Sequence, residues 1–90
     1  MTWTIEFDDR ARKELRKLDI SSQGDVLKYL KERLSKIKDP KIFGKPLLYE
    51  KSGLWRYRVR DIRVICRISE DEQLIFVTRI GHRKHIYRNI

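Results

Sequence analysis

Alternating arginine and apolar residues on both sides of a short turn constrain this chain more than any other feature. Residues 54–67 read Leu-Trp-Arg-Tyr-Arg-Val, then Arg-Asp, then Ile-Arg-Val-Ile-Cys-Arg. Because successive side chains of a strand point to opposite faces, this pattern predicts two antiparallel strands, over 54–59 and 62–69, joined by Arg60 and Asp61. The two-residue turn sets Val59 opposite Ile62 and Arg58 opposite Arg63.

The predicted hairpin has an apolar face and a basic face. The apolar face carries Trp55, Tyr57, Val59, Ile62, Val64, Cys66 and Ile68. The other face, called the arginine face below, carries Arg56, Arg58, Arg63, Ile65 and Arg67. Like charges that face each other across strands are destabilising, so a sheet that keeps several is a candidate anion site. The alternative is an ordinary solvent face with basic edge protection, which predicts mixed polar types rather than almost only arginine.

Composition supports an anionic partner. The 90 residues, interpreted as one domain over 1–90, contain 22 Lys and Arg against 13 Asp and Glu, a formal net charge of +9. Basic domains of this kind meet nucleic acid, an anionic membrane or an acidic protein. From Lys45 onward the chain has eight arginines and three lysines. Arginine matches phosphate oxygens in a bidentate way, so we expect the functional surface in the second half.

Several classes of protein are disfavoured by what the sequence contains. One cysteine allows no internal disulfide, and two histidines without ligand spacing predict no metal site. The four glycines are scattered, so no phosphate loop and no cofactor are expected. The longest apolar run, 74–77, is far shorter than the ~20 residues that span a bilayer. With no recognisable signal peptide, we expect a cytoplasmic protein.

The remaining pattern predicts an α+β fold. A strand over 2–7 precedes a helix that begins after Asp8 or Asp9, with an apolar stripe at Ala11, Leu15 and Leu18. A second helix is expected from Ser21 or Ser22 to Asp39-Pro40, and a third meander strand over 73–80, ended by Gly81. The order β-α-α-β-β-β predicts a helical hairpin packed on one face of a twisted antiparallel sheet. Arg79 can join the arginine face, depending on the register of the last strand.

Residues after the last predicted strand can do chemistry. Histidine titrates near neutral pH, so His82 and His85 are candidates for proton transfer, with surface positions as the alternative. Tyr87 can stack on a base or tack the tail to the sheet. Arg83, Lys84 and Arg88 extend the basic surface. We expect nucleic-acid contacts from Arg67, Arg79 and Arg88.

Two stretches carry a resemblance to a known family. Residues 54–65, Leu-Trp-Arg-Tyr-Arg-Val-Arg-Asp-Ile-Arg-Val-Ile, and 77–87, Val-Thr-Arg-Ile-Gly-His-Arg-Lys-His-Ile-Tyr, resemble the RelE/ParE superfamily of toxins from bacterial toxin–antitoxin pairs. The opening strand, the charged helical hairpin and Lys45-Pro46-Leu47 are similar too, and the tail is closer to RelE than to ParE.

The resemblance implies a RelE-like fold and a metal-independent endoribonuclease that cleaves messenger RNA in the ribosomal A site. In such toxins the 2′-hydroxyl attacks the adjacent phosphate and the 5′-oxygen leaves. By position, Arg56 and Arg58 match basic residues of the first central strand, and Arg63 matches a phosphate-clamping arginine. Arg83 matches the arginine that is implicated as the general acid, and Tyr87 matches the tyrosine that stacks on or orients the substrate. The implied partners are the ribosome, the message and a cognate antitoxin.

This chain also departs from the RelE pattern. RelE has lysines where this chain has Arg56 and Arg58, and arginine is a poor base because its pKa is very high. The pair is therefore expected to hold phosphates, while proton transfer passes to His82, Lys84 or His85. Two other functions stay open: a ParE-like inhibitor of DNA gyrase, and a non-toxic basic RNA-binding module.

Overall fold

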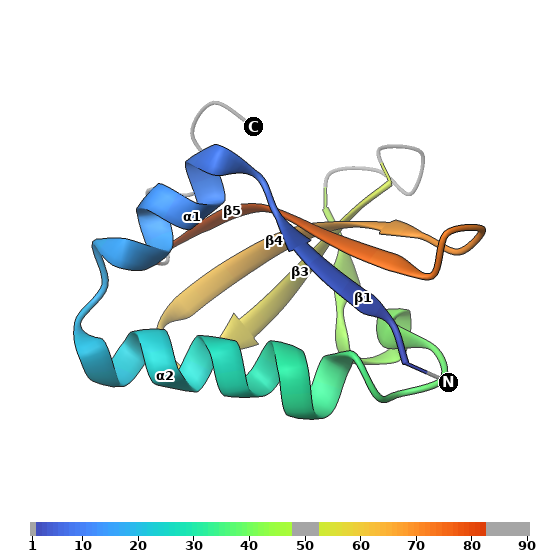
Figure 1. The fold of residues 1–90 in the computed structure, drawn as a ribbon, viewed down its shortest axis with the longest axis horizontal. Helices are drawn as coiled ribbons and strands as arrows, with labels where there is room; N and C mark the ends of the chain where they lie inside the picture. Colours follow the sequence, from blue (N-terminus) through green and yellow to red (C-terminus); the bar gives the residue numbers. More distant parts are fainter. Residues whose placement is uncertain (1, 48–52, 83–90) are drawn as a thin grey trace.

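The computed structural model describes residues 2–47 and 53–82 (Figure 1). A short strand and two helices come first, followed by two single turns and the remaining strands. The elements are β1 (Thr4–Phe7), α1 (Asp9–Arg16), α2 (Ile20–Lys28), η1 (Tyr29–Leu34), η2 (Pro40–Phe43), β2 (Lys45–Pro46), β3 (Leu54–Val59), β4 (Ile62–Ser69) and β5 (Leu74–His82). The order agrees with the predicted β-α-α-β-β-β, with β2 as an additional short strand.

The strands form one mixed sheet in the order β1-β5-β4-β3-β2. The meander is antiparallel, as expected, but β1 pairs with β5 in parallel, Thr4 with Leu74 and Phe7 with Val77. The expectation of a purely antiparallel sheet is therefore wrong at this edge. The alternation of residues 2–7 indicates a strand, but it carries no information about which distant strand becomes its neighbour.

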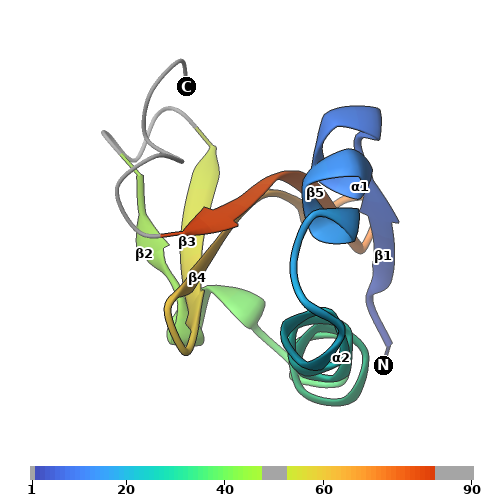
Figure 2. The same cartoon turned by 90° about the vertical axis from the view of Figure 1, so that its left-hand side faces the viewer.

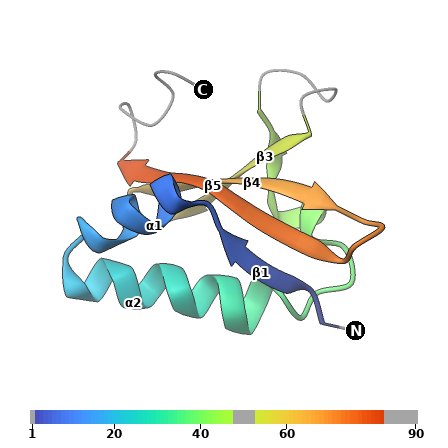
Figure 3. The same ribbon diagram turned by 45° about the horizontal axis from the view of Figure 1, so that its top comes forward.

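The helices cover one side of the sheet (Figures 1 and 2). The predicted stripe of α1 is buried at Ala11 and Leu15, with Leu18 just beyond the helix. Figure 3 shows α1 beside the end of β5, and the two elements are in contact. No helix of the described ranges is both long and apolar enough to cross a membrane.

The second helix differs from the prediction at both ends. It begins at Ile20, because the Asp19 carboxylate accepts a hydrogen bond from the Ser22 N–H at 3.3 Å and caps the first turn. It ends with the π-helical turn η1, where the Ser35 N–H donates to the Leu30 carbonyl at 2.9 Å. The Ser35 hydroxyl also donates to the Lys31 carbonyl, so the last turn is closed before Pro40.

The main core lies between the helices and the apolar face of the hairpin. Its completely buried members from α2 and η1 are Val26, Leu30 and Leu34. They share a cluster with side chains of the central strands, including Tyr57, Val64, Cys66, Ile75, Val77 and Ile80. A smaller cluster of Leu47 and Ile65, with Leu54 packed against it, is separate from this core. It gives the arginine face an apolar floor.

A β-bulge interrupts the pairing of β4 with β5, whose register the sequence leaves open because residues 74–77 are all apolar. The pairing shifts between Ile65 and Cys66, which lie opposite Arg79 and Val77, so that Thr78 is the extra residue. The Thr78 hydroxyl donates to the Ile65 carbonyl at 3.1 Å. After the bulge β5 continues to His82, and Gly81 pairs with Arg63 instead of ending the strand.

Candidate active site

The arginine face forms with the predicted register. In the β3–β4 ladder Arg58 lies opposite Arg63, and Arg56 lies opposite Ile65. Both strand ranges, Leu54–Val59 and Ile62–Ser69, agree with those predicted from the alternation. The turn between them is tight, with Arg60 at a φ of 56°. Pairing of the strands thus brings three guanidinium groups from two adjacent segments onto one face.

A small pocket lies where these arginines meet the connector that precedes β3, which consists of η2, Gly44 and β2. Its lining residues are Phe43, Lys45, Arg56, Arg58 and Arg63, and its volume is about 180 Å³. Four of these five side chains are cationic at neutral pH. Lys45 is in β2, which pairs antiparallel with β3 and sets Lys45 opposite Arg56. The pocket therefore presents converging positive charge, which favours an anion.

Arg63 has a polar atom that is buried but unsatisfied among the described residues. Its Nη1 atom is buried and has no hydrogen-bond acceptor within the described part of the chain. A buried donor without an acceptor costs about 1–3 kcal/mol, and an anion in the pocket can supply the missing partner. Gly81, the cross-strand neighbour of Arg63 on β5, adds no side chain beside it. The arrangement leaves room for a ligand next to this guanidinium.

The connector is held against β3 by a close approach at Gly44. A Cβ placed on Gly44 would lie 2.8 Å from Cζ of Tyr57 and 3.2 Å from the carbonyl oxygen of Arg56. The buried Tyr57 hydroxyl donates to the Pro40 carbonyl at 2.8 Å, which fixes the start of η2. Only glycine fits between η2 and β2 here, and it places Phe43 and Lys45 on either side of the contact.

Chemically, this pocket is suited to binding and stabilising phosphate. Guanidinium and ammonium groups donate to phosphate oxygens and stabilise negative charge that develops on them. None of the pocket-lining residues is a carboxylate or a histidine. The lining groups therefore provide charge stabilisation, and a proton acceptor has to come from outside this set. No group of three or more metal-ligating side chains occurs among the residues described.

His82 is not brought to the pocket. It pairs with Ile62 at the end of β5, which places it in register with the apolar face, and it is exposed. Arg67 is exposed on β4, opposite Leu54 and Phe76, and does not line the pocket. The other predicted site residues, Arg83, Lys84, His85, Tyr87 and Arg88, lie outside the described residues.

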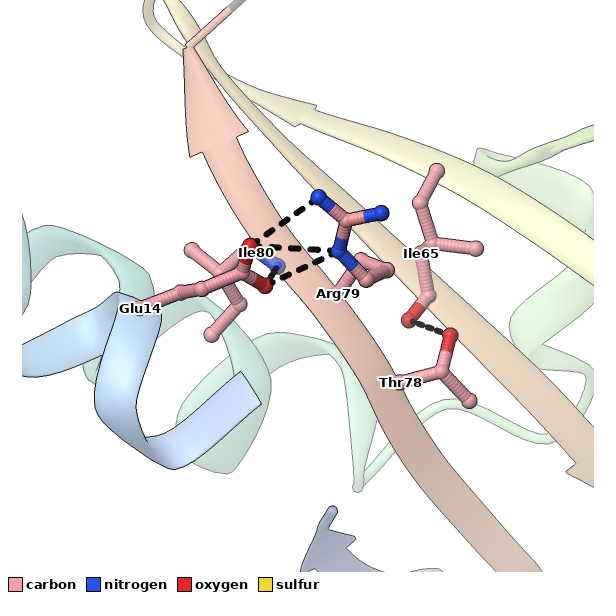
Figure 4. A network of polar contacts seen from close by, with 5 residues as sticks. All are labelled: Glu14, Ile65, Thr78, Arg79 and Ile80. Atoms are coloured by element: carbon pink, nitrogen blue, oxygen red, sulfur yellow. Dashed lines mark hydrogen bonds and ion pairs between the residues drawn. The ribbon is translucent and has the colours of Figure 1, made fainter. Parts of the chain in front are cut away.

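Arg79 is in register with the arginine face but is engaged by α1 (Figure 4). Its Nε donates to the two carboxylate oxygens of Glu14 at 3.2 and 3.1 Å, and its Nη2 lies 3.1 Å from the same carboxylate. Glu14 also accepts a hydrogen bond from the Ile80 N–H at 2.9 Å. This bond gives the backbone of β5 a partner beyond the point where β1 has ended. With its side chain only 11% exposed, Arg79 has a structural partner that the sequence pattern did not reveal.

Two pocket residues, Phe43 and Lys45, were not among the predicted site residues. Neither belongs to the alternating hairpin, because both are in the connector with Gly44 and Pro46. The sequence does hint at Lys45, since a basic residue follows a glycine shortly before the arginine-rich strand. Lys45 reaches the pocket only because β2 pairs with β3, and local periodicity does not specify that pairing.

Comparisons with known proteins find toxins of bacterial toxin–antitoxin systems. Residues 5–87 match the family described as "ParE toxin of type II toxin-antitoxin system, parDE". Toxin RelG of Mycobacterium tuberculosis is 32% identical over 88 residues, covering 98% of this chain and 99% of RelG.

Solved structures give the same result. A chain of the toxin–antitoxin complex RelBE2 from Mycobacterium tuberculosis matches with a TM-score of 0.81 and 29% identity, covering 92% of this chain and 93% of the other. A mutant of E. coli toxin RelE in complex with an antitoxin RelBc peptide matches with a TM-score of 0.74 and 25% identity, covering 93% and 86%.

Proposed function

Since the chain belongs to the RelE/ParE superfamily of toxins from type II toxin–antitoxin systems, we propose that it is a ribosome-dependent endoribonuclease. In this proposal it cleaves messenger RNA in the A site, in the cytoplasm, and thereby stops translation. The observation that carries the proposal is the pocket of Lys45, Arg56, Arg58 and Arg63, which concentrates phosphate-binding groups on one concave site.

The proposed reaction is an internal transfer at phosphorus. The 2′-hydroxyl of one nucleotide loses its proton and attacks the adjacent phosphate, the bond to the 5′-oxygen breaks, and that oxygen gains a proton. The products are a 2′,3′-cyclic phosphate and a 5′-hydroxyl. Negative charge builds on the phosphate oxygens in the transition state, where Arg56, Arg58 and Arg63 stabilise it. The reaction needs no metal.

Proton transfer is assigned by the family resemblance. Arg83 is proposed as the group that protonates the leaving oxygen, and Tyr87 as the group that orients the substrate. The proton acceptor is proposed to be Lys84 or His85, because a guanidinium that stays protonated at neutral pH cannot accept a proton and His82 is in register with the other face of the hairpin. Two further basic residues, Arg67 and Arg88, are proposed to contact nucleic acid, whereas Arg79 is held by the Glu14 carboxylate.

A cognate antitoxin is proposed as the protein partner. The support is that solved relatives are toxin–antitoxin complexes. An antitoxin with an acidic segment would complement the net charge of +9 and cover the pocket.

The test is primer extension on ribosome-bound message after induction. The wild-type protein is expected to leave cuts in the A site, and Arg63→Ala is expected to lower the cutting rate by at least tenfold. Arg60→Ala is the matched control, because Arg60 is in the neighbouring turn and does not line the pocket. Equal cutting by Arg63→Ala and wild type would refute the proposed role of the pocket.

A second candidate is a ParE-like inhibitor of DNA gyrase, favoured by the description of the matched family. Such a protein would inhibit supercoiling by gyrase in vitro and trigger DNA-damage signalling while translation continues. Intact message together with inhibited supercoiling would replace the nuclease proposal with this one.

A further inference from the structure

Phe43 is a large aromatic residue in an unusual place for an exposed side chain. It is 43% exposed and lines the pocket together with four cationic residues. Two other large apolar side chains of the described residues are exposed, Ile20 and Ile42, and neither lines this pocket. An aromatic ring beside converging cations is the combination that binds single-stranded nucleic acid, with stacking for a base and charge for the backbone.

The pocket has the size of a phosphate site rather than of a site that encloses a larger ligand. At about 180 Å³ the pocket is smaller than the roughly 300–1,000 Å³ that encloses drug-sized ligands. A phosphate group fits such a volume beside the arginines. Phe43 belongs to the same lining, so a base attached to a bound phosphate lies within reach of the exposed ring.

The ring is held in place before any ligand arrives. The guanidinium carbon of Arg33 lies over the Phe43 ring, 4.8 Å from its centroid, which is cation–π geometry. The Gly44 N–H donates to the Lys41 carbonyl at 3.1 Å and closes the turn that carries Phe43. An ordered ring loses little freedom on binding, so more of the stacking energy is available for affinity.

We propose that Phe43 is a stacking platform for the base of the nucleotide whose phosphate occupies the pocket of Lys45, Arg56, Arg58 and Arg63. The inference deepens the proposed function, on which it rests for the choice of RNA as ligand. It assigns base contact to a residue of the connector, next to the phosphate-binding strands. Because every base has a π-face, the platform tolerates any base but requires one.

The test compares Phe43→Leu, Phe43→Trp and wild type in binding a fluorescent single-stranded RNA decamer. One base–aromatic stack is worth about 1–3 kcal/mol, so Phe43→Leu is expected to weaken binding by about 5- to 150-fold, and Phe43→Trp to retain it. On a decamer of abasic riboses the three proteins are expected to bind equally. Thermal melts confirm that each variant is folded, and Ile42→Ala is the matched control with unchanged RNA affinity.

Three outcomes overturn the platform: no loss in Phe43→Leu, an equal loss on the abasic decamer, or a loss confined to capture of a cognate antitoxin. The cleavage assay is read independently. If wild type cuts no message but its RNA affinity depends on the aromatic ring, the nuclease proposal fails and the platform stands. If wild type cuts message and Phe43→Leu binds RNA normally, only the platform fails.

Discussion

Arg58 lies directly opposite Arg63 in the β3–β4 ladder, so two positive side chains share one cross-strand position. Facing like charges destabilise a sheet, and Lys45 and Arg56 add to the local charge. The fold retains this arrangement because the main core lies on the other face of the hairpin and supplies the stability. Stability and anion binding therefore make opposite demands on the same pair.

Reversing one charge of this pair tests that opposition. Arg58→Glu places a carboxylate opposite Arg63 and is expected to raise the free energy of unfolding by about 0.2–1 kcal/mol. Under the proposed function the same change is expected to lower RNA affinity, because it removes one phosphate-binding group and adds a carboxylate that repels the phosphate. Urea unfolding and RNA binding measure the two effects. Lys36→Glu is the control for net charge, since Lys36 is exposed and outside the sheet; a similar gain in stability there would contradict the pairwise explanation.

Gly44→Ala tests the close approach of the connector to β3. The added methyl group meets the Tyr57 ring at 2.8 Å and the Arg56 carbonyl at 3.2 Å, so η2 or β3 must shift. We expect a loss of about 1–3 kcal/mol in the free energy of unfolding, together with weaker RNA binding. Gly24→Ala is the control, because a Cβ there meets nothing within 4 Å and α2 gains a better helix former. Equal effects of the two substitutions would argue against the contact.

Glu14→Gln tests the carboxylate that joins α1 to β5. Glutamine can still accept the Ile80 N–H, but it replaces the charged Glu14 partner of the nearly buried Arg79 with a neutral one. The expected loss is about 1–3 kcal/mol in the free energy of unfolding. The double variant Glu14→Gln, Arg79→Met is expected to recover part of this loss, because it also removes the charge that Glu14 no longer offsets. If the double variant is less stable than the single one, the ion pair is not the source of the effect.

Alkaline pH is expected to destabilise the fold through two buried acids. Burial raises the pKa of the Cys66 thiol above its ordinary 9.0 and that of the Tyr57 hydroxyl above its ordinary 10.0. Both groups ionise in the unfolded chain while they stay neutral in the fold. The full stability is therefore present below these ordinary values and declines as pH rises through them, by about 1.4 kcal/mol per pH unit and group.

Urea unfolding between pH 7 and 11 checks this expectation. In Cys66→Ala the decline that begins near the ordinary thiol pKa is expected to disappear, while the later part due to Tyr57 remains. A wild-type stability that does not change up to pH 10 would contradict the account.

Local periodicity predicted the part of the site that lies on the hairpin. Once Arg60 and Asp61 are identified as a two-residue turn, the pairing of Arg58 with Arg63 and of Tyr57 with Val64 follows from strand geometry alone. The same reasoning identified the apolar stripe of α1 and the burial of Cys66.

The rest depends on contacts between residues far apart in the chain. Phe43 and Lys45 reach the pocket through η2 and β2, whose position depends on Tyr57 and Gly44. The partner of Arg79 is Glu14, on a helix near the start of the chain. The bulge at Thr78 changes which residues of β5 face the core, and alternation in an apolar strand cannot reveal such a shift.

The parallel pairing of β1 with β5 affects the order in which the fold can assemble during synthesis. Phe7 leaves the ribosome early, yet its partner Val77 follows only after both helices and the first two meander strands. Non-local pairing of this kind is slow, because a long loop must close before any contact rewards it. A nascent chain therefore completes its sheet only after residues 74–82 have been synthesised.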